Sequence, residues 1–476
     1  MNNLEQNPQS CQTDVVCSTG TVNEYLNFLE QKKHTIGNFG FNPTFFPEIA
    51  FDFQNNVIEK AVNKGRMALF LDTGLGKTLI QLSIAYNVVL KTNKRVLILT
   101  PLAVGFQFVK EAEKIGVPDV YQTLKGELNG KIIICNYERL HFLNSKDFEC
   151  VILDESSILK NFDGKIKNQI TNFIKKVPYR FLATATPAPN DYIEFGTSSE
   201  ALGYLPYMDM LQRFFRNNEN NIRPQEIGNK WYLKPHAKDD FFSWLNLWSL
   251  TIKKPSDLGF DDSRHILPAL NENINMVYNT ENWLINGQIM LFNGIARTMT
   301  EVREEQKGTT KIRCEKAVEL AKDKTSVYWC HFNDDGNLLE ELDSEAIQIK
   351  GGDKLEKKED ILLNFANGNI KRLITKPKIT SFGLNWQHCN HTVYFPTWSY
   401  EQYYQAIRRF WRFGQTNDVT VDLVVSDGQE RVLEALKYKT QKAIEFNQSI
   451  QKAINKTVNT DTNKEFNKEL IKPKFL

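Results

Sequence analysis

The chain has 476 residues and a formal net charge of +2, because 59 Lys and Arg nearly balance 57 Asp and Glu. Apolar residues make up 41% of the chain, which excludes a disordered polymer. The charge balance excludes a protein whose whole surface is basic, but it allows a local basic groove. No apolar run approaches the ~18 residues of a membrane span. Seven cysteines without a CxxC pair or zinc spacing fit a reducing cytosol. We therefore expect a cytoplasmic protein of several domains.

The first predicted unit follows a polar N-terminal segment and alternates short apolar runs with amphipathic stretches. Its predicted strands are Met67–Leu71, Arg95–Leu99, Lys131–Cys135, Val151–Leu153 and Arg180–Ala183. The predicted helices between them include Leu79–Leu90 and Val104–Lys114. Alternation of strands and helices indicates a parallel sheet with helices on both faces.

A second unit of similar rhythm begins near Ser326. Its predicted strands are Ser326–Cys330, Ala346–Ile349, Arg372–Thr375, Thr392–Phe395 and Val419–Val425, and its helices are Leu355–Phe365 and Tyr400–Phe413. The sequence thus predicts an α/β fold with two parallel-sheet units in tandem.

Composition suggests how the rest of the chain is divided. The stretch 191–325 is rich in Trp, Phe and Asn and weakly periodic for strands, so we expect a mostly helical insertion between the units. The predicted domains are a flexible segment 1–20, a first unit 21–190, the insertion 191–325, a second unit 326–450 and a tail 451–476. The tail carries six lysines against three acids and is either solvated or an arm that touches DNA.

A phosphate-binding loop is predicted directly after the first strand. Residues 71–78 read LDTGLGKT and open a helix. Glycines let backbone N–H groups approach phosphate oxygens, a lysine reaches the β- and γ-phosphates, and the next hydroxyl can hold Mg²⁺. The strict pattern has Gly where Leu71 stands. The predicted ATP-binding residues here are Thr73, Gly74, Leu75, Gly76, Lys77 and Thr78.

Two adjacent acids end the strand Val151–Leu153. Asp154 is placed to take a water of Mg²⁺, and Glu155 to orient and deprotonate the attacking water. We therefore predict Thr78 and Asp154 as metal-binding residues and Glu155 as a catalytic residue.

These motifs occur in an order that resembles the superfamily-two helicases of the Swi/Snf group. The resemblance rests on Gln54 (the glutamine motif), Asp154–Ser157 (the DExx box), Lys160-Asn161, Thr184–Pro187 (the third motif), Gly383–Asn385 (the fifth) and Gln405–Gln415, which reads QAIRRFWRFGQ (the sixth). The motifs run from Gln54 to Gln415, about three quarters of the chain. The compact length and the segment 254–259 resemble small phage and prophage helicases.

The resemblance implies two RecA-like lobes with Mg²⁺·ATP between them. Gln54 would read adenine, and Gln405, Arg409 and Arg412 of the second lobe would be catalytic. The two arginines are three residues apart and could project from one helix face as arginine fingers. The residues expected along the nucleic-acid track are Pro101, Asn136, Thr184, Thr186, Thr375, Lys376 and Asn385.

Because no zinc finger or recognition helix is evident, we expect contacts to phosphates rather than to base edges. The prediction is a DNA-stimulated ATPase and translocase or helicase of a bacterium or phage, with duplex DNA favoured and bound independently of sequence. An RNA helicase is one alternative. The other is a nucleotide-gated DNA-binding scaffold with vestigial hydrolysis, which Ser157 supports because it replaces the usual His of the DExx box. Trp386 either stacks on a base or lies in the core, and core packing is the simplest interpretation of Phe410-Trp411.

Overall fold

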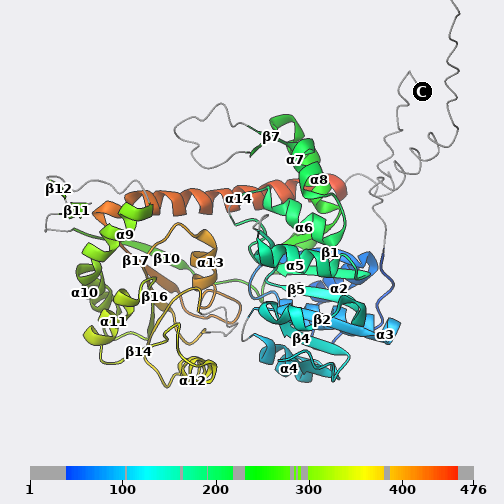
Figure 1. The fold of residues 1–476 in the computed structure, drawn as a ribbon, viewed down its shortest axis with the longest axis horizontal. Helices are drawn as coiled ribbons and strands as arrows, with labels where there is room; N and C mark the ends of the chain where they lie inside the picture. The colour runs from blue at the N-terminus through cyan, green and yellow to red at the C-terminus, as the bar shows by residue number, and fades with distance from the viewer. Residues whose placement is uncertain are drawn as a thin grey trace, which may run out of the picture. The chain divides into compact units, whose positions relative to one another are not determined.

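The computed structural model describes residues 39–101, 104–160, 164–189, 191–217, 231–278, 283–285, 288–290, 299–379 and 386–458. Two parallel sheets with helices on both faces make up most of this part of the chain (Figure 1). The predicted fold class is confirmed.

The first sheet has seven strands, and every neighbouring pair in it is parallel. Its interior strands are continuous apolar runs, as expected for a sheet buried on both faces. In spatial order the strands are β3 (Val120–Gln122), β4 (Ile132–Asn136), β2 (Arg95–Thr100), β5 (Phe148–Asp154), β6 (Tyr179–Thr184), β1 (Arg66–Leu71) and β9 (Ser249–Ile252).

Alternate side chains of these strands enter two separate cores. Leu69 and Ile98 face the core beneath α2 (Asp52–Lys64), α3 (Lys77–Thr92) and α4 (Gly105–Lys114). Phe70 and Leu97 face the opposite core, whose helices are α5 (Lys165–Ile174), α6 (Glu194–Leu202), α7 (Tyr207–Phe214) and α8 (Lys238–Asn246). Because β5, β6 and β1 are parallel neighbours, their carboxyl ends meet at one edge of the sheet, where ligand sites of such sheets form.

The second sheet has six parallel strands in the order β10 (Leu270–Val277), β17 (Val419–Ser426), β16 (His391–Tyr394), β13 (Ser326–Trp329), β15 (Arg372–Thr375) and β14 (Ala346–Gln348). Residues of α10 (Thr310–Ala321) and α11 (Asn333–Leu342) pack on one face, and residues of α12 (Leu355–Ala366) and α13 (Tyr400–Ile407) pack on the other. Trp386 is fully buried among these residues, which settles its place in the core.

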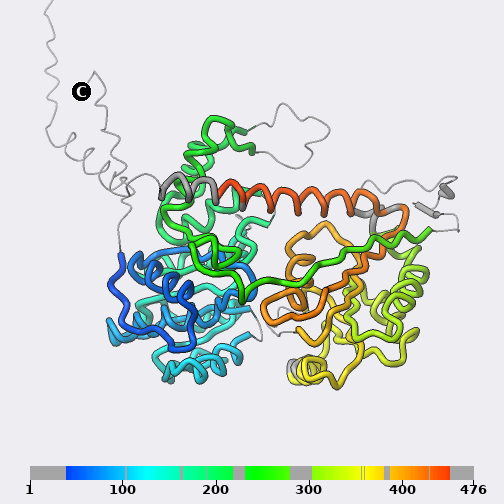
Figure 2. Tube along the Cα trace, turned by 180° about the vertical axis from the view of Figure 1, so that it is seen from behind, coloured from blue at the N-terminus to red at the C-terminus, as the bar shows by residue number. Residues whose placement is uncertain are grey.

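The stretch 191–325 differs from the expected helical insertion. Besides helices, among them α9 (Met299–Gly308), its described part contains the strands β7 (Phe215–Asn217), β8 (Trp231–Leu233), β9, β10, β11 (Trp283–Ile285) and β12 (Gln288–Met290). Its strand β9 extends the first sheet and β10 the second, while α10 lies in a core of the second sheet. Figure 2 shows the green segment after β9 running on to the strand β10. β10 is an eight-residue edge strand whose side chains are largely exposed, so it lacks the apolar run that marks a central strand.

The longest described helix, α14 (Glu430–Val458), contacts the cores of both lobes (Figure 1). Leu436 packs in the core of the second sheet, whereas Phe446 and Ile450 pack in the core of the first. The first eight residues of the predicted tail belong to this helix, and 459–476 lie outside the described residues. None of the described helices has the length and apolar composition to cross a bilayer.

Replacement of Phe446 by Ala should lower the free energy of unfolding by about 3–5 kcal/mol, because it leaves a cavity among packed rings. The Phe446 ring lies 5.1 Å from that of Phe195 and 5.6 Å from that of Tyr192. Urea denaturation followed by tryptophan fluorescence measures the change. Tyr438→Ala on the same helix is the control, since Tyr438 is 64% exposed; equal losses in both variants would contradict a packing role for Phe446.

Candidate active site

The phosphate loop joins the end of β1 to the start of α3 at the carboxyl edge of the first sheet. Gly74 and Gly76 have φ angles of +88° and +79°, which only glycine adopts without strain. A Cβ on Gly76 would lie 2.2 Å from Nε2 of Gln54, so a side chain at this position would displace the Gln54 amide. The predicted need for glycine at both positions is confirmed by this geometry.

Gln54 lies against the loop. Its Nε2 donates a hydrogen bond to the Leu75 carbonyl (3.0 Å), and its Oε1 accepts one from the Phe51 amide (2.9 Å). The side chain is buried and both ends of its amide are engaged by the backbone. Gln54 therefore supports the loop from the α2 side, while its contact with adenine stays a prediction.

Lys77 turns its ammonium group back over the loop. Nζ donates to the carbonyl oxygens of Leu71 (3.0 Å) and Asp72 (3.4 Å). Burial lowers the pKa of Lys77, and the nearby carboxylates of Glu155, Asp72 and Asp154 oppose this shift. A partly buried cation at the mouth of a glycine-rich loop is a suitable partner for phosphate oxygens.

Asp154 ends β5 beside α3. Its Oδ1 accepts a hydrogen bond from Nε2 of Gln81 (2.8 Å), and its backbone carbonyl accepts one from the hydroxyl of Tyr137 (2.6 Å). Burial, together with the charge of Glu155, raises the pKa of Asp154 to about 6. Two adjacent acids in a buried place favour a cation there.

The residues fit Mg²⁺ bound with a nucleotide. Asp154 and the Thr78 hydroxyl would hold it, since magnesium takes few protein ligands and shares phosphate oxygens, and it would neutralise charge on the phosphates. Among the described residues no group of three or more His, Cys, Asp and Glu could hold a metal by itself. Binding of Mg²⁺ by Thr78 and Asp154 stays a prediction.

Glu155 has a φ angle of +56°, which is uncommon for any residue except glycine and asparagine and typical of functional sites. Its Oε1 accepts hydrogen bonds from Oγ1 of Thr184 (2.8 Å) and from Nε2 of Gln405 (3.4 Å). The Thr184 hydroxyl in turn accepts one from the Thr186 amide (3.0 Å). The carboxylate is thus held by one residue from each lobe, and this link between the DExx box and its neighbours does not involve Ser157.

The predicted arginines reach the same place from the second lobe. Burial lowers the pKa of Arg409 to about 10, against the opposing charges of Glu155 and Asp154. Burial also lowers the pKa of Arg412 to about 10, together with its arginine neighbours, and the charge of Arg412 contributes to the lowered pKa of Lys77. The structure therefore brings Arg409 near the acids and Arg412 near the lysine of the first lobe.

The predicted helix Tyr400–Phe413 is wrong at its end, because α13 stops at Ile407. Arg409 and Arg412 lie on the turns that follow, so they do not share a helix face. Phe410 lies in the turn that follows, and its fully buried ring is 5.7 Å from that of Trp386, inside the core of the second lobe. Core packing thus explains Phe410, whereas Trp411 donates from Nε1 to the Pro268 carbonyl (2.7 Å).

Most of the residues predicted for the nucleic-acid track have buried side chains. They are Asn136, Thr184, Thr186 and Thr375. Asn136 donates to the Pro101 carbonyl (3.1 Å), and Lys376 donates to Oδ1 of Asn333 (2.6 Å). Asn385 lies outside the described residues. Contact of these residues with nucleic acid stays a prediction, and the observed role of Thr184 is to hold Glu155.

Sequence reasoning missed several residues that support the predicted ones, either directly or through Asp72. They are Asp72, Gln81, Tyr137, Tyr404 and Arg408. Gln81 offered one signal, since it lies one helical turn after Lys77 and so faces the same side of α3. The contacts of Tyr404 and Arg408 with Asp72 span more than 330 residues and leave no local pattern.

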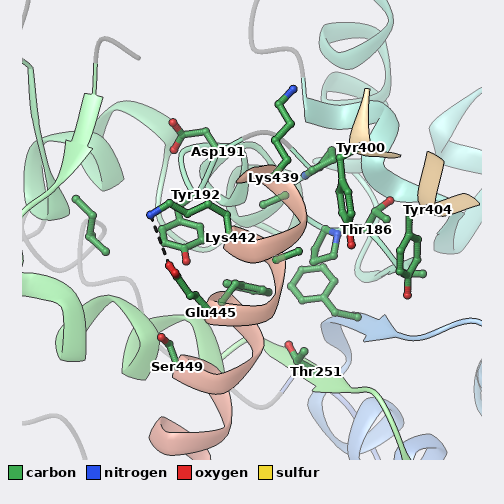
Figure 3. A pocket seen from close by; sticks show the side chains of 18 of the residues that line it. Thr186, Asp191, Tyr192, Thr251, Tyr400, Tyr404, Lys439, Lys442, Glu445 and Ser449 are labelled. Carbon is green, nitrogen blue, oxygen red and sulfur yellow. Dashed lines mark ion pairs between the residues drawn. The ribbon is translucent and has the colours of Figure 1, made fainter. Parts of the chain in front are cut away.

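A pocket of about 650 Å³ adjoins this site (Figure 3). Asp72 and Tyr404 line one part of it, and Lys442 and Glu445 of α14, 3.6 Å apart as an ion pair, line another. The buried hydroxyls of Thr186 and Thr251 also line it, and neither Oγ1 has a hydrogen-bond partner within the described part of the chain.

Comparison with known proteins gives two family matches and a similar solved structure. Residues 51–195 match the family DEAD/DEAH box helicase, and residues 310–414 match the family helicase conserved C-terminal domain. Among solved structures, the Sulfolobus solfataricus SWI2/SNF2 ATPase core in complex with dsDNA is similar over 84% of this chain and 92% of that chain, with 17% sequence identity and a TM-score of 0.40. No curated protein matches the chain at a significant level.

A phosphate loop and two adjacent acids lie on one α/β lobe, and arginines of the second lobe reach them, an arrangement suited to hydrolysis of a nucleoside triphosphate between the lobes. The chain carries a DEAD/DEAH box helicase domain followed by a helicase C-terminal domain, and its sheets are the two RecA-like lobes. It is thus an ATP-dependent helicase or translocase of nucleic acid.

Proposed function

We propose that this protein is a DNA-dependent ATPase of the Swi/Snf type that moves along duplex DNA. The observation that carries the ATPase part is the hydrogen bond of Gln405 to Glu155, together with Arg409 near the same acids and Arg412 near Lys77. Hydrolysis then requires both lobes, because neither lobe alone holds the base, the phosphate lysine and the arginines. Coupling of lobe closure to hydrolysis is what turns such a site into a motor.

The Swi/Snf assignment rests on the sixth motif with its Gly-Gln ending. Gln415 is buried, and its Nε2 donates to the Cys389 carbonyl (3.2 Å) while its Oε1 accepts from the Asn417 amide (3.0 Å). This residue therefore fixes the turn that carries the arginines. The same ending argues against an RNA helicase. The bacterial or phage origin and the cytoplasmic location stay predictions.

The decisive measurement is ATP turnover against a panel of duplex DNA, single-stranded DNA and RNA, with and without Mg²⁺. We expect duplex DNA to stimulate most, Mg²⁺ to be required, and stimulation to fall steeply with salt, since phosphate contacts release counterions. Stronger stimulation by single-stranded RNA would replace the proposal by an RNA helicase. Nucleotide-gated DNA binding without turnover would support the scaffold alternative.

Movement without strand separation has its own test. We expect the protein to displace a triplex-forming third strand in an ATP-dependent way while a fluorescent duplex stays paired. Separation of the duplex at a similar rate would assign a true helicase activity instead.

A further inference from the structure

Arg408 lies beside the two predicted arginine fingers but faces another part of the first lobe. Its Nη2 donates to Oδ2 of Asp72, the residue that begins the phosphate loop. The Tyr404 hydroxyl donates to Oδ1 of the same carboxylate. That oxygen also accepts a hydrogen bond from the Thr73 amide (2.6 Å). Asp72 is therefore held by two side chains of the second lobe and by its own loop.

This contact is buried and well enclosed. Asp72 is 7% and Arg408 9% exposed. The Arg408 guanidinium lies 4.5 Å from the ring centre of Trp411 and 5.2 Å from that of Tyr404, and its Nη1 donates to the Trp411 carbonyl (3.2 Å). Burial opposes its charge, yet the Tyr404 and Asp72 groups raise the pKa of Arg408 above its usual value. Removal of one partner from such a pair leaves an uncompensated buried charge.

The contact extends over the phosphate loop itself. The Asp72 carbonyl accepts from Nζ of Lys77, and a Cβ placed on Gly74 would lie 3.0 Å from the Cβ and backbone nitrogen of Phe413. The loop is thus bordered by the segment 404–413 at its start and at its middle. A shift of that segment would alter the surroundings of the loop amides.

We propose that Arg408 and Tyr404 form a latch with Asp72 that positions the phosphate loop when the lobes meet. They are positioning residues, distinct from Arg409 and Arg412, and act on ATP through the loop. The latch also neutralises Asp72, whose carboxylate would otherwise repel the phosphates from the loop. This inference rests on the proposed ATPase function.

The test is a double-mutant cycle of Arg408→Gln and Asp72→Asn. We expect Arg408→Gln to raise the Kd of a fluorescent ATP analogue and the KM for ATP by about tenfold. The value of kcat at saturating ATP should change much less, because the fingers and the base are intact. Adding Asp72→Asn should recover most of the lost affinity, since no unpaired charge remains. Tyr404→Phe should give a smaller loss of affinity in the same direction.

Lys254→Gln is the matched control, because it breaks the exposed Lys254–Asp262 ion pair (3.2 Å) of the segment between β9 and β10. Its Kd and KM should equal those of the unmodified protein. An Arg408→Gln protein with unchanged ATP affinity, or a double variant whose losses simply add, would overturn the latch. Failure of the proposed function would give a different result: the unmodified protein would bind the ATP analogue without turnover. The Kd values of the double-mutant cycle would still decide whether the latch exists.

Discussion

Replacement of Glu155 by Gln is expected to leave ATP bound and to reduce turnover by about 10²–10⁴-fold, the contribution of a positioned general base. The substitution preserves size, and one oxygen of the new amide can still accept the hydrogen bond from Thr184. What is lost is the group that takes the proton of the attacking water. Binding of a fluorescent ATP analogue and steady-state phosphate release measure the two effects separately.

Glu149→Gln is the matched control for this variant. Glu149 lies on the same strand, β5, and pairs with Lys94 at the surface (2.7 Å), so its loss should leave turnover unchanged. Turnover of Glu155→Gln within about threefold of the unmodified protein, well short of the general-base range, would remove Glu155 as the base. It would also revive the scaffold alternative.

The sequence predicted the first lobe because its signals are local. A buried parallel strand is a continuous apolar run, and a phosphate loop needs glycine at positions fixed by backbone geometry. Lys77, Asp154 and Glu155 follow such signals directly, and the structure brings them together. Each of these inferences needs only the neighbouring ten or so residues.

The second lobe's contribution was harder to predict, for reasons visible at individual residues. Phe410 has the same apolar character in a helix as in the turn that it occupies, and only the pocket between Trp329 and Trp386 decides between them. The partner of Arg408 lies on another lobe, and an arginine next to two others carries no local sign of its target. Tertiary packing, which a single sequence does not display, selects these conformations.

Thr184 shows a related limit. The motif Thr184–Pro187 predicted a place between the nucleotide and the nucleic acid, and the structure shows a hydrogen bond from Thr184 to Glu155. Its hydroxyl accepts from the Thr186 amide and donates to Glu155, so the two threonines form one chain of hydrogen bonds. A movement of the loop after β6 would therefore shift the Glu155 carboxylate, which gives a physical path for coupling that loop to the ATP site.

Replacement of Arg412 by Ala should lower kcat by about 10³–10⁵-fold and leave ATP affinity nearly intact, as for arginine fingers in general. The side chain lies where Lys77, Arg408 and Arg409 already concentrate positive charge, and its Nε has no hydrogen-bond partner within the described residues. Such a cluster is costly unless an anion enters it. Charge that spreads over the γ-phosphate during transfer is the anion best matched to it.

Two further variants make this prediction specific. Arg412→Lys should recover only part of the lost rate, because an ammonium keeps the charge but not the planar pair of donors. Arg303→Ala, on the exposed side of α9, should not change kcat. An Arg412→Ala protein that hydrolyses ATP at the original rate would show that this guanidinium does not meet the transferring phosphoryl group. Loss of ATP affinity with an unchanged kcat would instead show that Arg412 contributes to ATP binding and not to stabilisation of the transition state.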